Sequence, residues 1–421
     1  MSAQGPAHSE RTWAKVVWLF FLAWALNYAN RTVLSPLLIV LGSTWQLGNS
    51  QLGLFNSLFF LVYTGVQIPV GYIADRVGHK RTLMSCYFFH AVGSLMSALA
   101  WGPGSFAAAR VVAGLGQSSS YLTQYSLAAA VIPEERRAFG NSIINSGMGI
   151  GMAFGLAFSS ILVHGWGYGW RVPFAILGFT TVVMFLVLKR ELQWVPEVFR
   201  EKQKGIAKEG EKTELSTGAV LLRLVPAFIQ SFCSNYGFFA LLTWLPAYLE
   251  TAGYAGGLRA GLVSTLVPLL SIPGSLAWAW VSDWGKQRGY LSRRQVMGFL
   301  VTVAAASFWL IAVTDKLTYI VIGLIGIGLF GFLSLDPLTI TVVSQLTPPE
   351  MRGTMFGVKN FCTMLAAIIS PYLTGYLADL TGGFRLSFYV AGIVEVVAIL
   401  CLAGIQEPFR QTKEITNAES A

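Results

Sequence analysis

The sequence predicts an all-α membrane protein with twelve transmembrane helices in two pseudo-symmetric six-helix bundles. Of its 421 residues, 54% are hydrophobic and only 12% are charged, whereas about a quarter of the residues in a soluble domain are charged. The apolar residues form blocks of about 20, which is the length of helix that crosses a bilayer core. A repeat between the two halves of the chain is the third observation, and it sets the six-plus-six division.

Apolar windows and their polar breaks define the expected helices. They lie near residues 13–41, 51–74, 82–101, 105–132, 139–163, 170–189, 219–249, 258–282, 294–313, 317–346, 354–379 and 384–405. One long polar connection, rich in Lys and Glu, separates the first six from the last six. We therefore expect an N-terminal bundle over residues 1–189, a cytoplasmic linker over 190–218 and a C-terminal bundle over 219–421.

The net charge of +9 is distributed as a membrane protein requires, which removes the argument for nucleic acid as a partner. Of the 29 Lys and Arg residues, 23 lie at the termini and in one set of alternate connections. The other six are Arg31, Arg110, Arg171, Arg259, Lys316 and Arg385. By the positive-inside rule both termini are cytoplasmic, in a multi-pass protein of the cell inner (plasma) membrane.

The two halves repeat short motifs at similar lags. Asn27-Tyr28 recurs as Asn235-Tyr236 after 208 residues, and the Trp170-Arg171 pair that opens helix 6 recurs as Phe384-Arg385 after 214. Such lags indicate a duplicated six-helix unit. In transporters built this way the substrate site lies near the bilayer midplane between the repeats.

The loop after helix 2 reads GYIADRVGHKR over residues 71–81, and a weaker copy, DWGK, follows helix 8 at residues 283–286. This loop resembles the signature of the major facilitator superfamily. The resemblance implies the major facilitator fold and a gate that stabilises the outward-facing state and breaks on inward opening. It assigns Asp75, Arg76, Arg81 and Asp283 to that gate. The alternative for Arg81 is a simple positive charge that sets topology.

Within that superfamily, residues 27–35 of helix 1 and 243–249 of helix 7 look like the anion:cation symporter family, which moves sugar acids, other organic anions and phosphate. That family has an Asp before the helix 1 Arg and an acid in helix 4, both associated with proton coupling. This chain has Asn30 and Gln117 at those positions, and an amide does not titrate. Coupling has then moved elsewhere, or the protein is a uniporter or exchanger, or the substitutions are engineered.

Arg31 is the strongest single candidate for contact with a ligand. A charged side chain inside a membrane helix is costly and usually serves a function. Asn27 lies one turn before Arg31 on the same face, with Tyr28 adjacent. A planar guanidinium binds a carboxylate through two charge-assisted hydrogen bonds, which suits an organic anion. The alternative is that Arg31 extends to the outer membrane interface.

Two further helices complete the predicted substrate site. Gln117, Tyr121 and Gln124 form a polar stripe on helix 4, for which helix-helix hydrogen bonding is the alternative. In helix 7 the repeat predicts equivalents of the helix 1 residues. The predicted substrate-binding set is Arg31, Asn27, Tyr28, Tyr121, Gln124, Asn235 and Tyr236.

Asp336 is the clearest carboxylate well inside a span, and Pro337 follows it. By the repeat it lies within one turn of the position equivalent to Gln117, so it is a candidate for the missing coupling acid, with Asn30 and Gln117 as former coupling positions. Permanent pairing with Lys359 or Arg352 is an equally good interpretation. An acid inside a membrane span is functional by default.

Enzyme chemistry and cofactors find no support in the sequence. The four histidines are scattered without metal-ligand spacing, and a GxGxxG pattern at residues 326–331 lies inside an apolar helix with no preceding strand. No metal site is predicted. We predict a monomeric secondary active transporter, a symporter of a small carboxylate or sugar acid with proton coupling, working by alternating access in the lipid bilayer. The alternatives are an uncoupled uniporter or exchanger, a spinster-type lysolipid transporter, and a membrane receptor.

Overall fold

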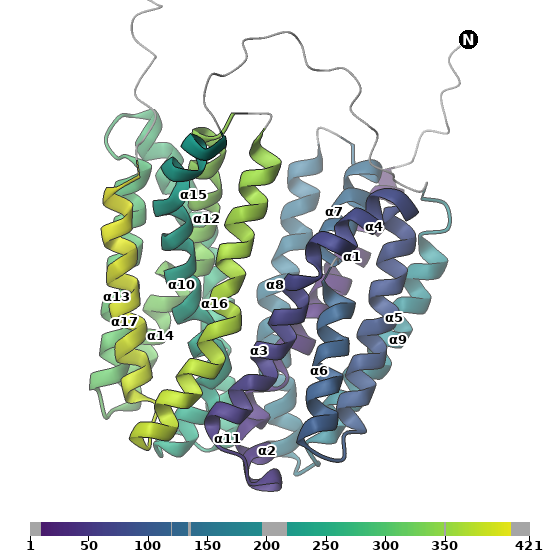
Figure 1. Ribbon diagram of the computed structural model, residues 1–421, viewed down its shortest axis with the longest axis vertical. Coiled ribbons are helices and arrows are strands. Elements are labelled where there is room, and N and C mark those ends of the chain that lie inside the picture. Colours follow the sequence, from purple (N-terminus) through teal and green to yellow (C-terminus); the bar gives the residue numbers. More distant parts are fainter. Residues whose placement is uncertain (1–9, 119, 134–135, 196–216, 349–350, 406–421) are drawn as a thin grey trace, which may run out of the picture.

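The computed structural model describes residues 10–118, 120–133, 136–195, 217–348 and 351–405, and all regular structure within these ranges is helical. Each of the predicted helices is present, and the all-α fold class is confirmed. Figure 1 shows the helices of the first half and those of the second half as two side-by-side groups.

The helices of the N-terminal half are α1 (Glu10–Thr32), η1 (Ser35–Leu37), α2 (Leu38–Trp45), α3 (Asn49–Gly65), α4 (Gln67–Val77), α5 (His79–Ala98), α6 (Pro103–Gln117), α7 (Ser120–Val131), α8 (Arg137–Ser160), η3 (Ile161–Gly165, a π-helix) and α9 (Arg171–Glu191). Those of the C-terminal half are α10 (Thr217–Thr251), α11 (Gly257–Ser264), α12 (Leu266–Gln287), α13 (Arg293–Val313), α14 (Leu317–Phe330), α15 (Phe332–Leu346), α16 (Arg352–Thr381) and α17 (Arg385–Ala403).

Several expected helices are interrupted, and in three cases proline or glycine lies at the break. Helix α3 ends at Gly65, and α4 continues at an angle of 42°. Pro69 has no N–H to offer the carbonyl of Gly65, and its ring crowds that carbonyl. The same relation holds between Pro268 and Ser264, where α11 gives way to α12. Gly331 separates α14 from α15. A hydropathy window finds the span but not these breaks.

Eight helices of the described residues are long and apolar enough to cross a membrane, and the bent pair α3–α4 makes a ninth. The outer faces of the bundles agree with that assignment. Large apolar side chains are exposed there, among them Leu22 at 53%, Phe179 at 66% and Leu400 at 68%. In a bilayer such side chains face lipid rather than water.

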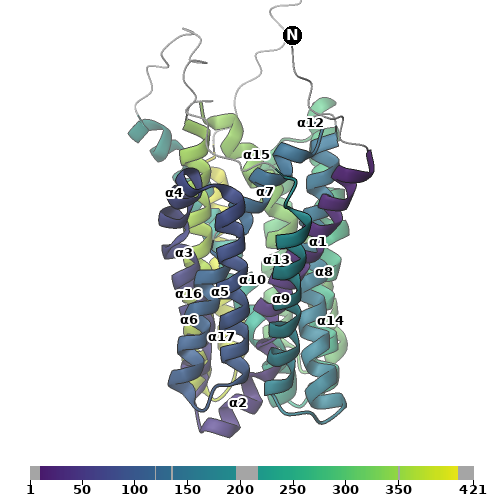
Figure 2. The same cartoon turned by 90° about the vertical axis from the view of Figure 1, so that its right-hand side faces the viewer.

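The two halves meet most closely along α3 and α16, which lie side by side in both views (Figures 1 and 2). A Cβ atom on Gly53 would lie 2.2 Å from the carbonyl oxygen of Pro371, and one on Gly375 would lie 2.4 Å from that of Asn49. The backbones therefore touch directly. At the start of α3, the carboxylate of Asp379 accepts the N–H groups of Asn49 and Ser50, both at 2.8 Å.

At the other end of the bundle, side-chain contacts hold the N-terminal half together. Lys15 of α1 pairs with Glu191 of α9 at 2.6 Å, and the ammonium of Lys80 donates to the carbonyl of Val195 at 2.7 Å. Most of the charged residues of α1 and α9 lie at this end, whereas Arg31 and Arg171 lie toward the other. The close contact of α3 with α16 thus lies toward the opposite end, where α2 and α11 are found (Figure 1).

Candidate functional site

Arg31 lies in the last turn of α1 with its guanidinium clamped between aromatic rings. The guanidinium carbon is 4.4 Å from the ring centre of Tyr28 and 4.6 Å from that of Tyr63. Its Nε donates to Oε1 of Gln117 at 2.7 Å, and its NH2 nitrogen has no partner among the described residues. The residue is 7% exposed, and no carboxylate of the described residues pairs with it. This cation is held in place but not neutralised.

Arg31 lines a cavity between the two halves of the chain. In this conformation the cavity is small, with a volume of about 10 Å³, which is room for roughly one water molecule. Its walls come from α1, η1, α3 and α8 of the first half and from α10 of the second. The lining residues are Tyr28, Arg31, Thr32, Ser35, Asn56, Phe60, Met152, Phe239, Leu242 and Thr243. Half of these residues are apolar or aromatic and half are polar or charged, so the wall combines apolar surface with hydrogen-bonding groups, as small-molecule sites do.

A second buried guanidinium lies beside this cavity. Arg110 of α6 is 3% exposed, and its carbon lies 4.7 Å from the ring centre of Phe59. It donates to Oδ1 of Asn56 at 3.1 Å, and Nδ2 of Asn56 lies 3.3 Å from the hydroxyl of Thr243 in the other half. Arg110 was missing from the predicted set. Its place on the same helical stripe as Gln117, two turns earlier, was the available signal.

Asn27 and Asn30 of α1 lie behind the cavity and not in its wall. Asn27 is fully buried and donates to the hydroxyl of Tyr87 at 3.1 Å. Asn30 donates to the carbonyl of Leu26 at 3.0 Å and accepts from Ser94 at 2.9 Å. Both side chains therefore bind neighbouring helices of their own half. An i, i+4 spacing puts Asn27 near the face of Arg31 but does not decide which neighbour takes its hydrogen bond.

Helix α7 does not bring its predicted residues to the cavity. Gln124 is fully buried and donates to the carbonyl of Phe20 in α1 at 2.6 Å. This is the helix-helix contact that the sequence left open as the alternative. Tyr121 is 53% exposed, and its ring packs against Trp24 and Tyr125 with centres 5.8 and 4.7 Å away.

In α10, the residues at the repeat positions differ in their surroundings. Asn235 is fully buried and donates to the carbonyl of Thr363 in α16, and Tyr236 is 2% exposed. Neither lines the cavity, whereas Phe239, at the position equivalent to Arg31, does. The cavity thus has cations on one side and an aromatic ring on the other.

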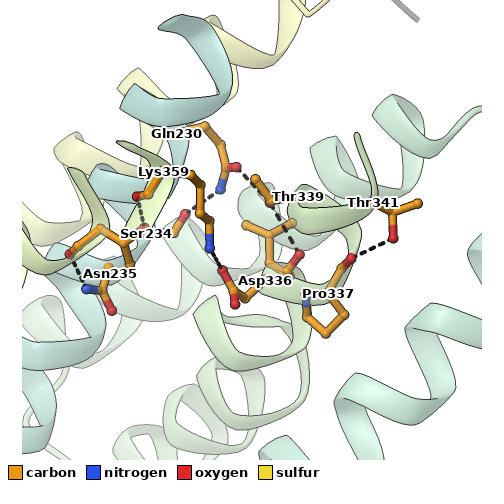
Figure 3. A network of polar contacts seen from close by, with 10 residues as sticks. Gln230, Ser234, Asn235, Asp336, Pro337, Thr339, Thr341 and Lys359 are labelled. Carbon is orange, nitrogen blue, oxygen red and sulfur yellow. Dashed lines mark hydrogen bonds and ion pairs between the residues drawn. The ribbon is translucent and has the colours of Figure 1, made fainter. Parts of the chain in front are cut away.

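Asp336 of α15 forms an ion pair with Lys359 of α16, as Figure 3 shows. The carboxylate side chain is 26% exposed, and that of the lysine is 7% exposed. Near the pair, Thr339 donates to Gln230 at 3.0 Å, and Gln230 lies 3.4 Å from the hydroxyl of Ser234. In this conformation Asp336 is therefore paired with Lys359, as the second of the two interpretations of this residue expects.

Three of the expected gate residues, Asp75, Arg76 and Asp283, have contacts within their own halves. Asp75 lies 3.6 Å from His79, one turn further along the chain, and the guanidinium of Arg76 lies 4.2 Å from the ring centre of Tyr72. Asp283 pairs with Arg293 in the C-terminal half. Arg81 takes part in an interaction at the start of α5.

The chain belongs to the Major Facilitator Superfamily, whose family model matches residues 20–362 and 284–420. It is a membrane transporter, and the matching family and relatives are transporters and not enzymes. Solved structures share the fold. A bacterial homologue of the human lysosomal transporter spinster, inward-facing and unoccupied, matches with a TM-score of 0.80 and 16% identity over 96% of this chain and 100% of that one. The inward-open xylose transporter XylE of E. coli gives 0.75 and 15%, over 97% and 99%.

Relatives of similar sequence carry names of organic-anion transporters. The probable galactarate/D-glucarate transporter GudP of Bacillus subtilis is 24% identical over 94% of this chain and 92% of its own. The hexuronate transporter of the same organism is 27% identical, over 96% and 97%. The gentisate transporter of Corynebacterium glutamicum is 24% identical, over 86% and 81%.

Proposed function

We propose that this protein is a secondary transporter of a small organic anion, a carboxylate or sugar acid, and that Arg31 holds the anionic group. The observation that carries the proposal is the Arg31 guanidinium, which lines a cavity between the halves with no carboxylate partner among the described residues. Holding an unneutralised cation inside a membrane protein is costly. An anion that enters the cavity would neutralise it.

The rest of the cavity suits such a cargo. Arg110 supplies a second cation close by, and Asn56, Thr243 and Ser35 supply uncharged hydrogen-bonding groups. A guanidinium fork binds a carboxylate through two parallel bonds. Galactarate, D-glucarate, hexuronates and gentisate, after which these relatives are named, all contain carboxylate groups. We extend the proposal to the other predicted residues, Asn27, Tyr121 and Gln124 of the first half and Asn235 and Tyr236 of the second, as the support around this pocket.

The same proposal includes alternating access between an N-terminal bundle of 1–189 and a C-terminal bundle of 219–421, joined by a cytoplasmic linker of 190–218. Both termini then lie in the cytoplasm of a monomer in the inner membrane. The direct backbone contact of α3 with α16 closes the end opposite the linker. Asp75, Arg76, Arg81 and Asp283 would form the gate at the linker end in the other conformation.

For coupling we propose protons, with Asp336 as the acid that takes them up. Its carboxylate is partly exposed and pairs with Lys359. A proton that binds the carboxylate would therefore take the place of the lysine ammonium as its partner. Asn30 and Gln117 occupy the positions where the symporters that this chain resembles have acids, and amides carry no proton. An uncoupled uniporter or exchanger is the other outcome.

Restoring both acids should change the energetics of transport. In the variant Asn30→Asp/Gln117→Glu we expect uptake to gain or strengthen a dependence on a proton gradient, because carboxylates titrate and amides do not. The measurement is uptake into proteoliposomes with and without a protonophore. Gln345→Glu, which converts an exposed amide at the end of α15, is the matched control. The same protonophore response in variant and unmodified protein would contradict the account of lost coupling sites.

Flux of defined solutes tests the function itself. Purified protein in liposomes should take up at least one of D-glucarate, galactarate, D-glucuronate and gentisate faster than empty liposomes do. A thermal-shift screen of carboxylates, phosphate esters and lysolipids identifies which to try first. Stabilisation and flux with lysolipids alone would replace the proposal with a spinster-type activity. Binding without flux would replace it with a receptor.

A further inference from the structure

Behind Arg31, a short chain of hydrogen bonds ends at a buried histidine that the transport mechanism above does not use. Oε1 of Gln117 accepts from Nε of Arg31 at 2.7 Å, and the amide nitrogen of Gln117 lies 3.0 Å from Nε2 of His90. Gln117 and His90 are each 1% exposed. The three residues come from α1, α6 and α5, so the chain ties three helices together behind the cavity.

The chemistry of the three groups fixes the direction of each bond. A guanidinium has donors only, so Gln117 has to turn its carbonyl oxygen toward Arg31. The amide NH2 then faces His90, and Nε2 of the imidazole has to accept. The ring proton therefore resides on Nδ1 of a neutral His90. A doubly protonated ring, or one with its proton on Nε2, offers Gln117 no acceptor.

Helix packing holds the imidazole where it is. A Cβ atom on Gly116, the residue before Gln117, would lie 2.2 Å from the backbone nitrogen of His90, so α5 and α6 touch through their backbones at this level. The ring centre of Tyr87, one turn earlier on α5, lies 6.2 Å from the centre of the His90 imidazole. Because both backbones are fixed, the distance from His90 to Gln117 is set by the fold.

We propose that His90 is a positioning residue for the anion. It holds the Gln117 amide in the one orientation that accepts from Nε of Arg31, so that the guanidinium keeps the position in which its NH2, buried and without a partner among the described residues, can pair with an anion. Without an acceptor at His90, the Gln117 amide loses the partner that keeps its oxygen on Arg31. This inference rests on the proposed function, in which Arg31 binds the anionic group.

Two substitutions at His90 separate positioning from packing. His90→Phe keeps a ring and removes the acceptor, and His90→Gln keeps an acceptor oxygen without the ring. With D-glucarate, galactarate and gentisate as probes, we expect the Kd of whichever binds to rise about tenfold in His90→Phe, the upper end of the effect of one lost hydrogen bond between neutral groups. In His90→Gln it should rise less than about threefold. KM for uptake should follow Kd, while kcat changes little.

A double variant tests the route through Gln117. If His90 acts by orienting that amide, His90→Phe/Gln117→Leu binds the anion no more weakly than Gln117→Leu alone, because contacting residues of one network are not additive. Additive losses would overturn the inference, and so would a His90→Phe protein that is folded and binds normally. A His90→Gln protein as weak as His90→Phe would also overturn it, since the role would then be packing.

A measurement without any ligand separates this inference from the proposed function. Nitrogen-15 spectra of histidine-labelled protein in nanodiscs, with the signals assigned by comparison with His90→Phe, should show a neutral ring with its proton on Nδ1. A ring protonated on Nε2 would overturn the hydrogen-bond chain. If the expected tautomer is found and none of the three anions binds the unmodified protein, the proposed function fails, and positioning for an anion fails with it.

Discussion

Arg31→Ala should abolish uptake of the anion while leaving the protein folded. The substitution removes the cavity cation that the ligand would neutralise, together with its bond to Gln117. Truncating one partner of a buried charge pair costs roughly 2–5 kcal/mol, so affinity should fall at least about 30-fold. Binding is measured by isothermal titration with the transported anion and flux by uptake into proteoliposomes.

Two companion variants sharpen that result. Arg31→Lys keeps the charge and loses the planar fork, so it should retain only part of the affinity. Arg259→Ala removes an exposed arginine from the start of α11 and should leave uptake near normal. Near-normal uptake by a folded Arg31→Ala protein would remove this arginine from the mechanism and the anion from the proposal.

Asp336→Asn should destabilise the protein more than Lys359→Met does. Removing the carboxylate leaves an ammonium group that is 7% exposed without its anion, whereas removing the lysine leaves a carboxylate that is 26% exposed and reaches water. Breaking a buried pair from one side costs about 3–5 kcal/mol, and we expect the lower end for Lys359→Met. The measurement is the thermal unfolding midpoint of each purified variant in the same detergent.

The double variant Asp336→Asn/Lys359→Met completes the test. It buries no uncompensated charge, so its midpoint should recover most of the loss seen in Asp336→Asn. If Asp336 carries the coupling proton, the double variant takes up its anion without responding to a protonophore. Equal destabilisation by the two single variants would show that the pair is not asymmetric. A preserved protonophore response in a stable double variant would move coupling away from Asp336.

The sequence predicted the helices better than it predicted their side-chain partners. A helix lies at every predicted window, and eight helices of the described residues, nine with the bent pair α3–α4, are long and apolar enough to cross a membrane. Hydropathy did not predict the break at Val66, which depends on the relation between Pro69 and Gly65. The long polar connection also marked the division into halves, although its residues 196–216 lie outside the described part of the chain.

For the site, the sequence identified the costly residue but not the arrangement around it. Arg31 stood out because a charge inside a span needs a reason, and Tyr28 followed as its neighbour. Gln124 carries the same kind of polar group and lies against the Phe20 carbonyl instead. Helical spacing gives the direction in which a side chain leaves its helix. The identity of the opposing helix is a property of the tertiary packing, so periodicity could not separate a cavity wall from a helix-helix contact.

The glycine contact between α3 and α16 bears on how the protein changes shape. Gly53 and Gly375 let two main chains touch, because neither residue has a side chain that would stand between them. When the two helices separate there, they lose dispersion contacts and the two hydrogen bonds from backbone N–H groups to Asp379. All of these contacts can form again when the helices return. A bulkier residue at Gly53, where a Cβ atom would meet only Pro371 and Tyr372 of the other half, would act as a wedge and raise the population of the opposite conformer without unfolding either half.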